Sequence, residues 1–484
     1  MIDSRQRRKA VGAFPTPPEI VRAVVAETLA APLARASWRA DGSPRLRILD
    51  PAVGDGRFLV ECARVLAAAA AARGFHPAAA RRAIVARVLV GVDRDAAACA
   101  AARAALGEGA DVRQGEALLD GVVDAGAFDA VVGNPPYVRA VTLKRADPDL
   151  WARLRGALAA TSYKEWDLYG AFLERALAWA RPDGDVGLVV PSRWLTGAFA
   201  ARLRARLAGS VRKIVDFGAE QRFPGATTYT ALVYLRRGSA ELAFERGGAT
   251  GRIPAARLGA APWVLGTDVV ERLRAVGPPL GEVARIAKGA GTNADPVFLL
   301  ERRGDGFFSA ALGCRVDVEP EAVVPCVRGR DVGEGTLALR RWALYPYDGD
   351  RLLPPDELRT RFPLAAAVLL RCRALLEARE GGRFRGPTFY RWGRPQNLRW
   401  LLDREPKIVV PDAARTPRAA IDAEGRLAID TAYAIRPTGA VPLARLYAAL
   451  RSPLVMEWLG AVGIPLRGGY VRLKTAYLAS LPVP

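Results

Sequence analysis

The sequence predicts an α/β protein with a mostly parallel sheet in its first half and a separate α+β unit in its second half. Up to about residue 240, short apolar and β-branched runs alternate with helical segments rich in Ala, Leu, Arg and Glu. This alternation is typical of a parallel sheet covered by helices on both faces. The sequence then becomes Gly-rich, and beyond it lie Arg-rich loops, aromatic residues and Pro-Gly turns. We therefore predict two domains, residues 1–240 and 241–484.

The strands of the first domain are predicted from its apolar runs. Six of them should be parallel strands: residues 46–49, 88–92, 111–113, 127–132, 186–190 and 213–217. A seventh run, residues 228–235, follows a Pro-Gly turn, and we expect it to pair antiparallel with residues 213–217. In the second domain we expect a helix near residues 442–462.

The composition limits the class of protein. The formal net charge of +21 is carried mainly by arginine and favours a phosphate backbone as partner, although a general Arg and Ala bias accounts for part of it. We see no signal peptide and no apolar run long enough to span a membrane, so we expect a cytoplasmic protein without a membrane partner. Five widely spaced cysteines indicate neither a disulfide framework nor a zinc site. The single histidine, His76, excludes a histidine triad and a histidine metal cluster.

The most informative motif is Asn134-Pro135-Pro136-Tyr137, which follows the apolar run 128–133. Open α/β sheets bind ligands at the carboxyl ends of their parallel strands. The two prolines contribute carbonyl acceptors but no N–H donors. The motif suits a planar amino group, whose two hydrogens are accepted by carbonyl oxygens while an aromatic ring stacks on its plane. The alternative is a strand that ends in a proline turn beside a core tyrosine.

A Gly-rich turn follows the first strand in the segment Asp50-Pro51-Ala52-Val53-Gly54-Asp55-Gly56. Its glycines allow a ligand to approach the backbone closely, and the helix that follows offers N–H groups to a carboxylate. The third glycine of the dinucleotide fingerprint is missing, which favours a smaller zwitterionic ligand over a pyrophosphate. A plain tight turn is the alternative.

Three further residues could complete this ligand site. Asp93 ends the second strand and could accept hydrogen bonds from both hydroxyls of a ribose, unless Asp93 or Asp95 caps the next helix. Glu116 follows the third strand and could accept an adenine amino hydrogen, or be a solvated acid. Thr16 and Glu19 are predicted to form a capping box, and Thr16 could also hold an amino-acid group.

Together these segments resemble the TaqI-like, gamma-order class of DNA adenine-N6 methyltransferases of restriction-modification systems. The resembling segments, in order, are PTPPEI (15–20), DPAVGDGRFL (50–59), the acid Asp93, GNPPY (133–137), DLYGAFLE (167–174), DVGLVVPSRWL (185–195) and FPGATTY (223–229). Residues 241–484 resemble the target-recognition domain of that class more loosely, through residues 289–295, 327–331, 407–412 and 467–472.

The resemblance implies a class I methyltransferase fold, S-adenosylmethionine as cofactor, double-stranded DNA as partner and base flipping, and it leaves open a separate restriction endonuclease. It implies a catalytic set of Asn134, Pro135, Pro136, Tyr137 and Phe223. It implies a cofactor site formed by Thr16, Asp50, Ala52, Gly54, Gly56, Asp93 and Glu116. Tyr137 and Phe223 would clamp the target base, with Tyr229 as an alternative to Phe223. The chain departs from the residues usual in the class at Val53, Asp55, Glu116 and Asp167.

Three alternative functions share some of these features. Release-factor glutamine methyltransferases use the same NPPY acceptors, but their accessory domain precedes the cofactor fold, whereas about half of this chain follows it. An RNA guanine methyltransferase is a weaker alternative for similar reasons. A non-catalytic DNA-binding subunit is disfavoured because the acids and the NPPY motif are intact. The segments 405–407 and 411–412 resemble nuclease fragments in reversed order, and we interpret them as strand and turn.

Overall fold

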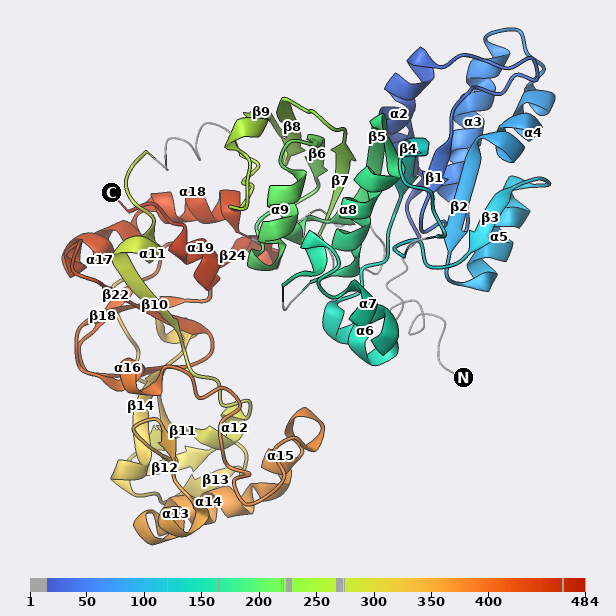
Figure 1. The fold of residues 1–484 in the computed structure, drawn as a ribbon. Helices are drawn as coiled ribbons and strands as arrows, with labels where there is room; N and C mark the ends of the chain where they lie inside the picture. Colours follow the sequence, from blue (N-terminus) through green and yellow to red (C-terminus); the bar gives the residue numbers. More distant parts are fainter. Residues whose placement is uncertain are drawn as a thin grey trace. The chain divides into compact units, whose positions relative to one another are not determined.

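The structure is a computed structural model that describes residues 15–119, 121–163, 166–218, 220, 222, 229–266, 273, 275–463 and 465–483. The chain forms two compact units, Met1–Thr267 and Asp268–Pro484 (Figure 1).

The first unit is built, in its described residues, on a nine-stranded sheet with the order β3-β2-β1-β4-β5-β7-β6-β8-β9. The strands are β1 (Ile48–Asp50), β2 (Leu89–Asp93), β3 (Asp111–Gln114), β4 (Phe128–Gly133), β5 (Ala180–Pro191), β6 (Val211–Asp216), β7 (Thr230–Leu235), β8 (Glu241–Arg246) and β9 (Ala249–Pro254). Strands β1 to β5 pair in parallel. Strand β7 lies antiparallel between β5 and β6 and places Ala231 opposite Asp216. The predicted fold class, the six strands and the antiparallel pairing are confirmed.

Helices cover both faces of this sheet, because successive residues of its buried strands point to opposite sides. Ile48 and Val132 belong to one buried apolar cluster, and their neighbours Leu49 and Val131 belong to another. The first cluster includes residues of α2 (Pro18–Arg35), α3 (Arg57–Ala71), α4 (Pro77–Arg87) and α5 (Ala96–Leu106). The second includes residues of α6 (Ala140–Ala146), α7 (Pro148–Leu154), α8 (Leu168–Trp179) and α9 (Ala201–Leu207).

The boundary between the two units differs from the predicted one at residue 240. Strand β8 extends the first sheet by pairing in parallel with β6, where Lys213 lies opposite Ala243. The Gly-rich stretch includes the β8–β9 turn, in which Gly247 and Gly248 have φ values of +55° and +82°. Glycine is needed there for a left-handed turn within the sheet. The first unit therefore continues to Thr267.

The second unit contains several small sheets in its described residues, with strand orders β10-β22-β18-β20, β13-β12-β11-β15-β14-β21, β16-β17 and β19-β24-β23. Its strands are β10 (Ala284–Lys288), β11 (Leu299–Arg303), β12 (Gly306–Ser309), β13 (Cys314–Val316), β14 (Val323–Val327), β15 (Arg341–Leu344), β16 (Tyr347–Asp348), β17 (Arg351–Leu352), β18 (Lys407–Pro411), β19 (Ala413–Ala414), β20 (Ala420–Asp422), β21 (Leu427–Ala428), β22 (Ala432–Pro437), β23 (Pro465–Leu466) and β24 (Tyr470–Arg472). Its α-helices are α11 (Leu280–Val283), α12 (Asp295–Phe298), α13 (Pro355–Arg361), α14 (Pro363–Arg371), α15 (Arg373–Glu377), α16 (Leu398–Leu402), α17 (Leu443–Arg451), α18 (Pro453–Val462) and α19 (Thr475–Ala479). The strand predicted at the nuclease-like segment is confirmed as β18.

The predicted helix near residues 442–462 is two helices. Helix α17 ends at Arg451, Ser452 is extended with ψ of 152°, and Pro453 is the first residue of α18. A proline cannot donate the backbone hydrogen bond that a continuous helix needs, and it favours an extended residue before it. Among the described residues, no helix combines the length and the apolar character needed to cross a membrane.

Candidate active site

The predicted site residues meet at the carboxyl ends of three adjacent strands. Strand β1 lies between β2 and β4 and is parallel to both. Asp50 is the last residue of β1, Asp93 is the last residue of β2, and Asn134 directly follows β4. The sheet topology thus brings two acids and an amide to one edge, where parallel α/β sheets bind ligands.

Thr16 joins this edge through its side chain and its carbonyl group. Asn134 Nδ2 donates a hydrogen bond to Thr16 Oγ1 at 2.9 Å, and Arg57 at the start of α3 donates to the Thr16 carbonyl oxygen. Thr16 is buried, with 2% of its surface exposed. The segment before α2 is therefore tied both to the Gly-rich turn and to the NPPY motif.

The predicted capping box of Thr16 and Glu19 is wrong. Helix α2 begins at Pro18, its N-cap residue is Pro17, and no side chain caps it. Because Pro17 and Pro18 carry no backbone N–H, two of the donors that a cap could satisfy are missing. The Thr16 hydroxyl instead accepts from Asn134.

Strands β1 and β4 approach closely at Gly133, the glycine of the GNPPY segment. A Cβ atom on Gly133 would lie 2.7 Å from Asp50 Oδ1, which is shorter than real contacts allow. Asp50 Oδ1 also accepts a hydrogen bond from Ala52 N at 3.1 Å. The absence of a side chain at position 133 therefore leaves room for the carboxylate beside Asn134.

The Gly-rich turn is held by the neighbouring acid and by its own left-handed residues. Gly54 N donates to Asp93 Oδ2 at 3.0 Å. Gly54 and Gly56 have φ values of +54° and +84°, and a Cβ atom on Gly56 would lie 3.0 Å from Ala102 Cα in α5. A side chain at either position would disturb the backbone that faces the sheet edge.

Asp95, and not Asp93, caps the following helix. Asp95 Oδ1 accepts from Ala97 N at 2.9 Å at the start of α5. Asp93 Oδ1 accepts from Asp95 N at 3.0 Å, so the Asp93 carboxylate is held between the Gly-rich turn and α5. Asp93 is half-buried.

Asp50 is a poorly solvated carboxylate. Burial raises the pKa of Asp50 to about 8, and the nearby charges of Asp93 and Asp55 contribute. Asp50 Oδ2 is buried and has no hydrogen-bond partner among the described residues. A buried anion without a partner on one oxygen is costly, and a cationic or hydrogen-bond-donating ligand would relieve that cost.

Glu116 lies in a partly closed environment. Burial raises its pKa, although its Oε1 accepts from Leu118 N at 3.0 Å and its Oε2 lies 3.3 Å from Arg94 Nε. Glu116 is therefore not a solvated acid, as the alternative interpretation would have it. Arg94, which no sequence pattern indicated, also pairs with Asp147 at the start of α7.

Tyr137 is held from two sides. Its hydroxyl lies 3.4 Å from the Val189 carbonyl oxygen in β5, and the Tyr169 ring meets it edge-on with centroids 6.2 Å apart. Burial raises the pKa of both tyrosines well above the usual range. Tyr169 belongs to the DLYGAFLE segment, which was the available sequence signal for a second aromatic beside the motif. Pro135 is buried, and Pro136 is half-buried.

Phe223 lies outside the described residues. Its alternative, Tyr229, is described, and its carbonyl oxygen accepts from Ser192 N at 2.9 Å. The geometry thus brings together the predicted set without Phe223, and adds Arg57, Arg94 and Tyr169.

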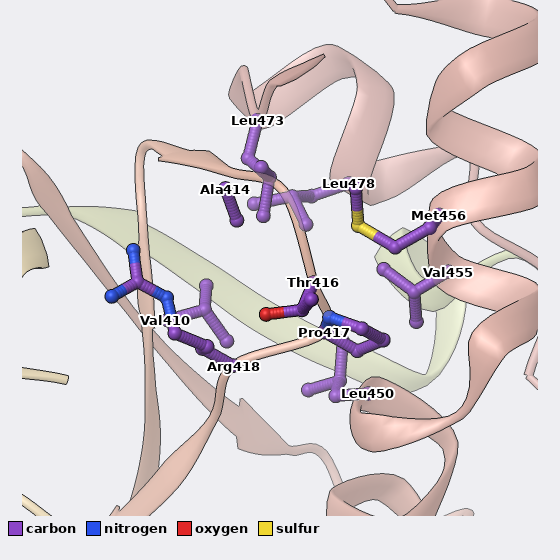
Figure 2. Close-up of a pocket in the computed structure, with 10 residues that line it drawn as sticks. All are labelled: Val410, Ala414, Thr416, Pro417, Arg418, Leu450, Val455, Met456, Leu473 and Leu478. Carbon is purple, nitrogen blue, oxygen red and sulfur yellow. The ribbon is translucent and has the colours of Figure 1, made fainter. Parts of the chain in front are cut away.

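A small hollow in the second unit lies apart from these residues in the sequence (Figure 2). It is lined by Val410, Ala414, Thr416, Pro417, Arg418, Leu450, Val455, Met456, Leu473 and Leu478. Its walls are mostly apolar and come from β18, β19, α17, α18 and α19 and the loops beside them. None of the predicted site residues faces it. In the part of the chain that the structure describes, no group of His, Cys, Asp and Glu side chains could hold a metal ion.

The chain is similar in sequence to known restriction-modification enzymes. Residues 98–223 match the Eco57I restriction-modification methylase family. The Type II methyltransferase M.XhoI of Xanthomonas vasicola is 27% identical over 74% of this chain and 68% of its own length. In residues 98–223 the chain is therefore similar to restriction-modification methylases of the Eco57I type.

Two further similarities differ in how much of each protein they cover. The Type II restriction enzyme and methyltransferase RM.Eco57I of Escherichia coli is 23% identical over 74% of this chain, and the match spans only 40% of that relative. The solved structure of the Type IIL restriction-modification enzyme MmeI in complex with DNA covers 99% of the chain with a TM-score of 0.64 and 15% identity. The alignment takes in 69% of the MmeI chain, and at this identity the likeness is one of fold.

Proposed function

We propose that this chain is a site-specific DNA methyltransferase of the TaqI-like gamma class that methylates the N6 amino group of adenine in duplex DNA. The observation that carries the proposal is the Asn134 side chain, which Thr16 holds at the sheet edge beside the buried Asp50. Similarity to restriction-modification methylases supports the choice of DNA as substrate. The DNA in the MmeI complex adds to that support.

The residues at the sheet edge fit S-adenosylmethionine, which would supply an electrophilic methyl group on a sulphonium centre. The buried Asp50 carboxylate, with no partner on Oδ2 among the described residues, suits a ligand that brings positive charge and N–H donors. Asp93 suits a ribose because carboxylates at this position accept hydroxyl hydrogens. The proposed cofactor residues are Thr16, Asp50, Ala52, Gly54, Gly56, Asp93 and Glu116.

Activation of the adenine amine would fall to Asn134 and Pro135. The lone pair of that nitrogen is delocalised into the ring, so the amine is a poor nucleophile. Asn134 Oδ1 and the Pro135 carbonyl oxygen would each accept one of its hydrogens, which favours a more tetrahedral nitrogen. Because Thr16 binds Nδ2, the Asn134 amide has a fixed orientation, and fixed acceptors need little reorganisation during the reaction.

The reaction would depend on alignment of the adenine amine with the methyl donor more than on a strong base. The proton can leave to solvent after methyl transfer, so the reaction does not require a histidine base. The sequence has a single histidine. Pro136 contributes no N–H that would compete with the amine for the acceptors.

An adenine inside duplex DNA must leave the base stack to reach such a site. Tyr137 and Phe223 would clamp the flipped base, and each stacking contact is worth about 1–3 kcal/mol. The edge-on Tyr169 ring limits rotation of Tyr137 and so favours one stacking plane. We assign target recognition to the second unit. A separate restriction endonuclease would be the cognate partner in such a system.

The substitution Asn134→Ala tests the proposal. Single-molecule sequencing of DNA from a host that expresses the wild-type chain should report N6-methyladenine in one sequence context. The Asn134→Ala variant should lose this signal while its affinity for S-adenosylhomocysteine, measured by calorimetry, stays within a few-fold of wild type. Retained DNA methylation by the variant would refute the role of Asn134. Methylation of a release-factor peptide or of RNA, without methylation of DNA, would refute the substrate.

A further inference from the structure

The segment that follows the NPPY motif presents an exposed basic surface. Helices α6 and α7 form a short helical pair directly after residue 139. We call this segment, residues 139–155, the basic hairpin. Its exposed basic side chains are Arg139, Lys144, Arg145, Arg153 and Arg155, and its only acids are Asp147 and Asp149.

The basic hairpin is fixed to the same sheet edge as the candidate active site. Asp147 caps α7 by accepting from Leu150 N at 2.9 Å, and it also forms an ion pair with Arg94. Arg94 directly follows Asp93 at the end of β2. On its inner side the hairpin buries Leu143 and Leu150 in the core cluster of the sheet. The hairpin is therefore a positioned element beside the site.

The basic side chains of the hairpin are available for a partner. Elsewhere in the first unit, arginines pair with acids, as Arg236 does with Asp185 and Arg181 does with Asp129. Among the described residues, none of the five basic side chains of the hairpin forms an ion pair. A general preference for arginine explains their number, but it does not explain why these five lack acidic partners.

Two of these cations share one aromatic ring. Lys144 Nζ lies 4.7 Å and Arg155 Cζ lies 5.1 Å from the centroid of Trp151. Trp151 is half-buried, so the ring orients both side chains while their charged ends stay exposed. Ordered cations of this kind are suited to phosphate groups.

We propose that the basic hairpin binds the phosphate backbone of the DNA beside the flipped adenine. This inference rests on the proposed function. The hairpin is continuous with the catalytic motif, since Arg139 lies two residues after Tyr137. Backbone contacts at that position would hold the strand whose base enters the site, without reading its sequence.

The test compares two matched double variants. Lys144→Gln/Arg155→Gln removes the pair of cations at Trp151. The control, Arg73→Gln/Arg82→Gln, removes two exposed cations, of which Arg73 lies 4.7 Å from the Trp38 ring centroid. Arg73 follows the end of α3, which starts at the carboxyl edge of the sheet and runs back along it. Arg82 lies in α4, which leads into the start of β2, so both control cations lie away from the site.

The measurement is the dissociation constant for duplexes with and without the target site, across a series of salt concentrations. Removal of each cation that binds a phosphate should reduce the slope of log K against log salt by about 0.9, and weaken binding roughly eight-fold at about 0.1 M salt. Lys144→Gln/Arg155→Gln should show this loss equally for both duplexes, with unchanged affinity for S-adenosylhomocysteine. The control variant should behave like wild type.

Two results would overturn the inference. Equal salt slopes for the test and control variants would exclude phosphate binding by the hairpin. A loss confined to the duplex that carries the target site would assign the hairpin to base recognition. If the double variant unfolds, the single variant Arg145→Gln, which removes another exposed cation of the same hairpin, replaces it under the same criteria. A wild-type protein that methylates no DNA would instead refute the proposed function.

Discussion

Asn134 Nδ2 donates a hydrogen bond to Thr16 Oγ1 over 2.9 Å, and this bond joins two residues that are 118 positions apart in the sequence. It fixes the amide in the orientation that would turn its oxygen to an adenine amine. It also links the segment before α2 to the NPPY motif, so one hydroxyl connects the proposed cofactor residues with the proposed catalytic residues.

Thr16→Val should lower the turnover number by about ten-fold, because the loss of one buried hydrogen bond costs about 0.5–1.5 kcal/mol and leaves Nδ2 without its acceptor. Thr16→Ser keeps the hydroxyl and serves as the control, with turnover near wild type. The turnover numbers of both variants are measured by steady-state methylation kinetics with saturating cofactor. Equal turnover of the Val and Ser variants would show that the bond does not orient Asn134.

Gly133→Ala should destabilise the first unit by about 1–3 kcal/mol, which is the usual cost of overpacking. The new Cβ atom would lie 2.7 Å from Asp50 Oδ1, and both groups are fixed by adjacent strands. Gly209→Ala is the control, because a Cβ atom at position 209 would have no atom within 4 Å. The free energies of unfolding of the two variants, measured by urea unfolding, should differ by about 1–3 kcal/mol. A Gly133→Ala variant as stable as the control would show that the strands can separate at this point.

The central strands of the sheet were predictable because runs such as β2, β4 and β7 are apolar and buried on both faces, and such runs have few alternatives. Strand β4 is buried along its whole length, and the predicted range of residues 127–132 differs from it by one residue at each end. The NPPY motif and the acids at the strand ends were predictable for a related reason. Parallel topology alone brings the ends of β1, β2 and β4 to one edge.

Contacts made by single side chains were not predictable. The sequence around Thr16 satisfies the rule for a capping box, but a tertiary partner, Asn134, binds its hydroxyl. Arg94 likewise resembles any exposed arginine until the fold places it between Glu116 and Asp147. The boundary between the units differs from residue 240 because glycines in a hairpin turn and glycines in a linker have the same local signature.

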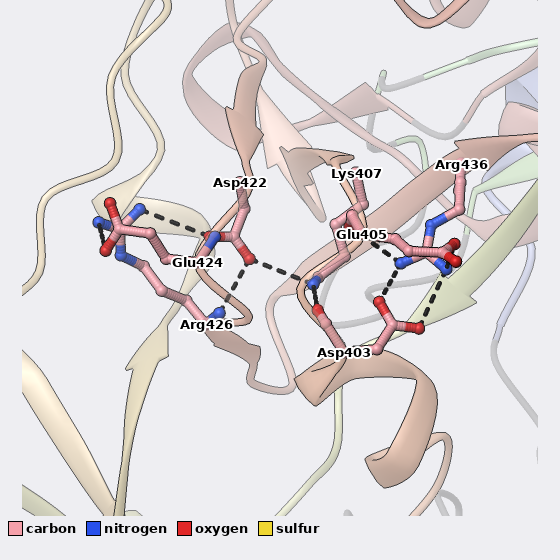
Figure 3. A network of polar contacts seen from close by, with 7 residues as sticks. All are labelled: Asp403, Glu405, Lys407, Asp422, Glu424, Arg426 and Arg436. Atoms are coloured by element: carbon pink, nitrogen blue, oxygen red, sulfur yellow. Dashed lines mark hydrogen bonds and ion pairs between the residues drawn. The ribbon is translucent and has the colours of Figure 1, made fainter.

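Lys407→Met should destabilise the second unit by about 3 kcal/mol, because removal of one partner leaves a buried charge poorly compensated. Lys407 Nζ lies 3.3 Å from Asp422 Oδ2, both side chains are fully buried, and Nζ also donates to the Asp403 carbonyl oxygen at 2.7 Å (Figure 3). Arg359→Gln, which breaks an exposed pair with Asp356, should leave the melting temperature nearly unchanged. Differential scanning calorimetry compares the two variants. Arg426 Nη1 also lies 3.5 Å from Asp422 Oδ1, and equal melting temperatures would show that Arg426 alone compensates Asp422.

Asp50→Asn should make the first unit less dependent on pH and, above about pH 8, more stable than wild type. The unfolded Asp50 carboxyl titrates near its ordinary pKa of 3.8, whereas burial raises the pKa to about 8 in the folded chain. Between these values the folded state keeps a proton that the unfolded state has lost. The stability that Asp50 contributes is therefore fully present below about pH 4 and is lost as the pH rises through about 8. The Asn side chain keeps the oxygen that accepts from Ala52 N and cannot ionise, so the variant escapes this loss.

The free energy of unfolding of Asp50→Asn and of wild type can be measured in urea at several pH values between about 4 and 9. Plotted against pH, the two curves should diverge up to about pH 8 and then run parallel. At about pH 9, where the wild-type carboxyl is ionised, the same variant should bind S-adenosylhomocysteine more weakly than wild type, since Asn cannot supply the anion proposed to face the ligand. Parallel curves over the whole range would show that Asp50 is already ionised in the folded protein at neutral pH.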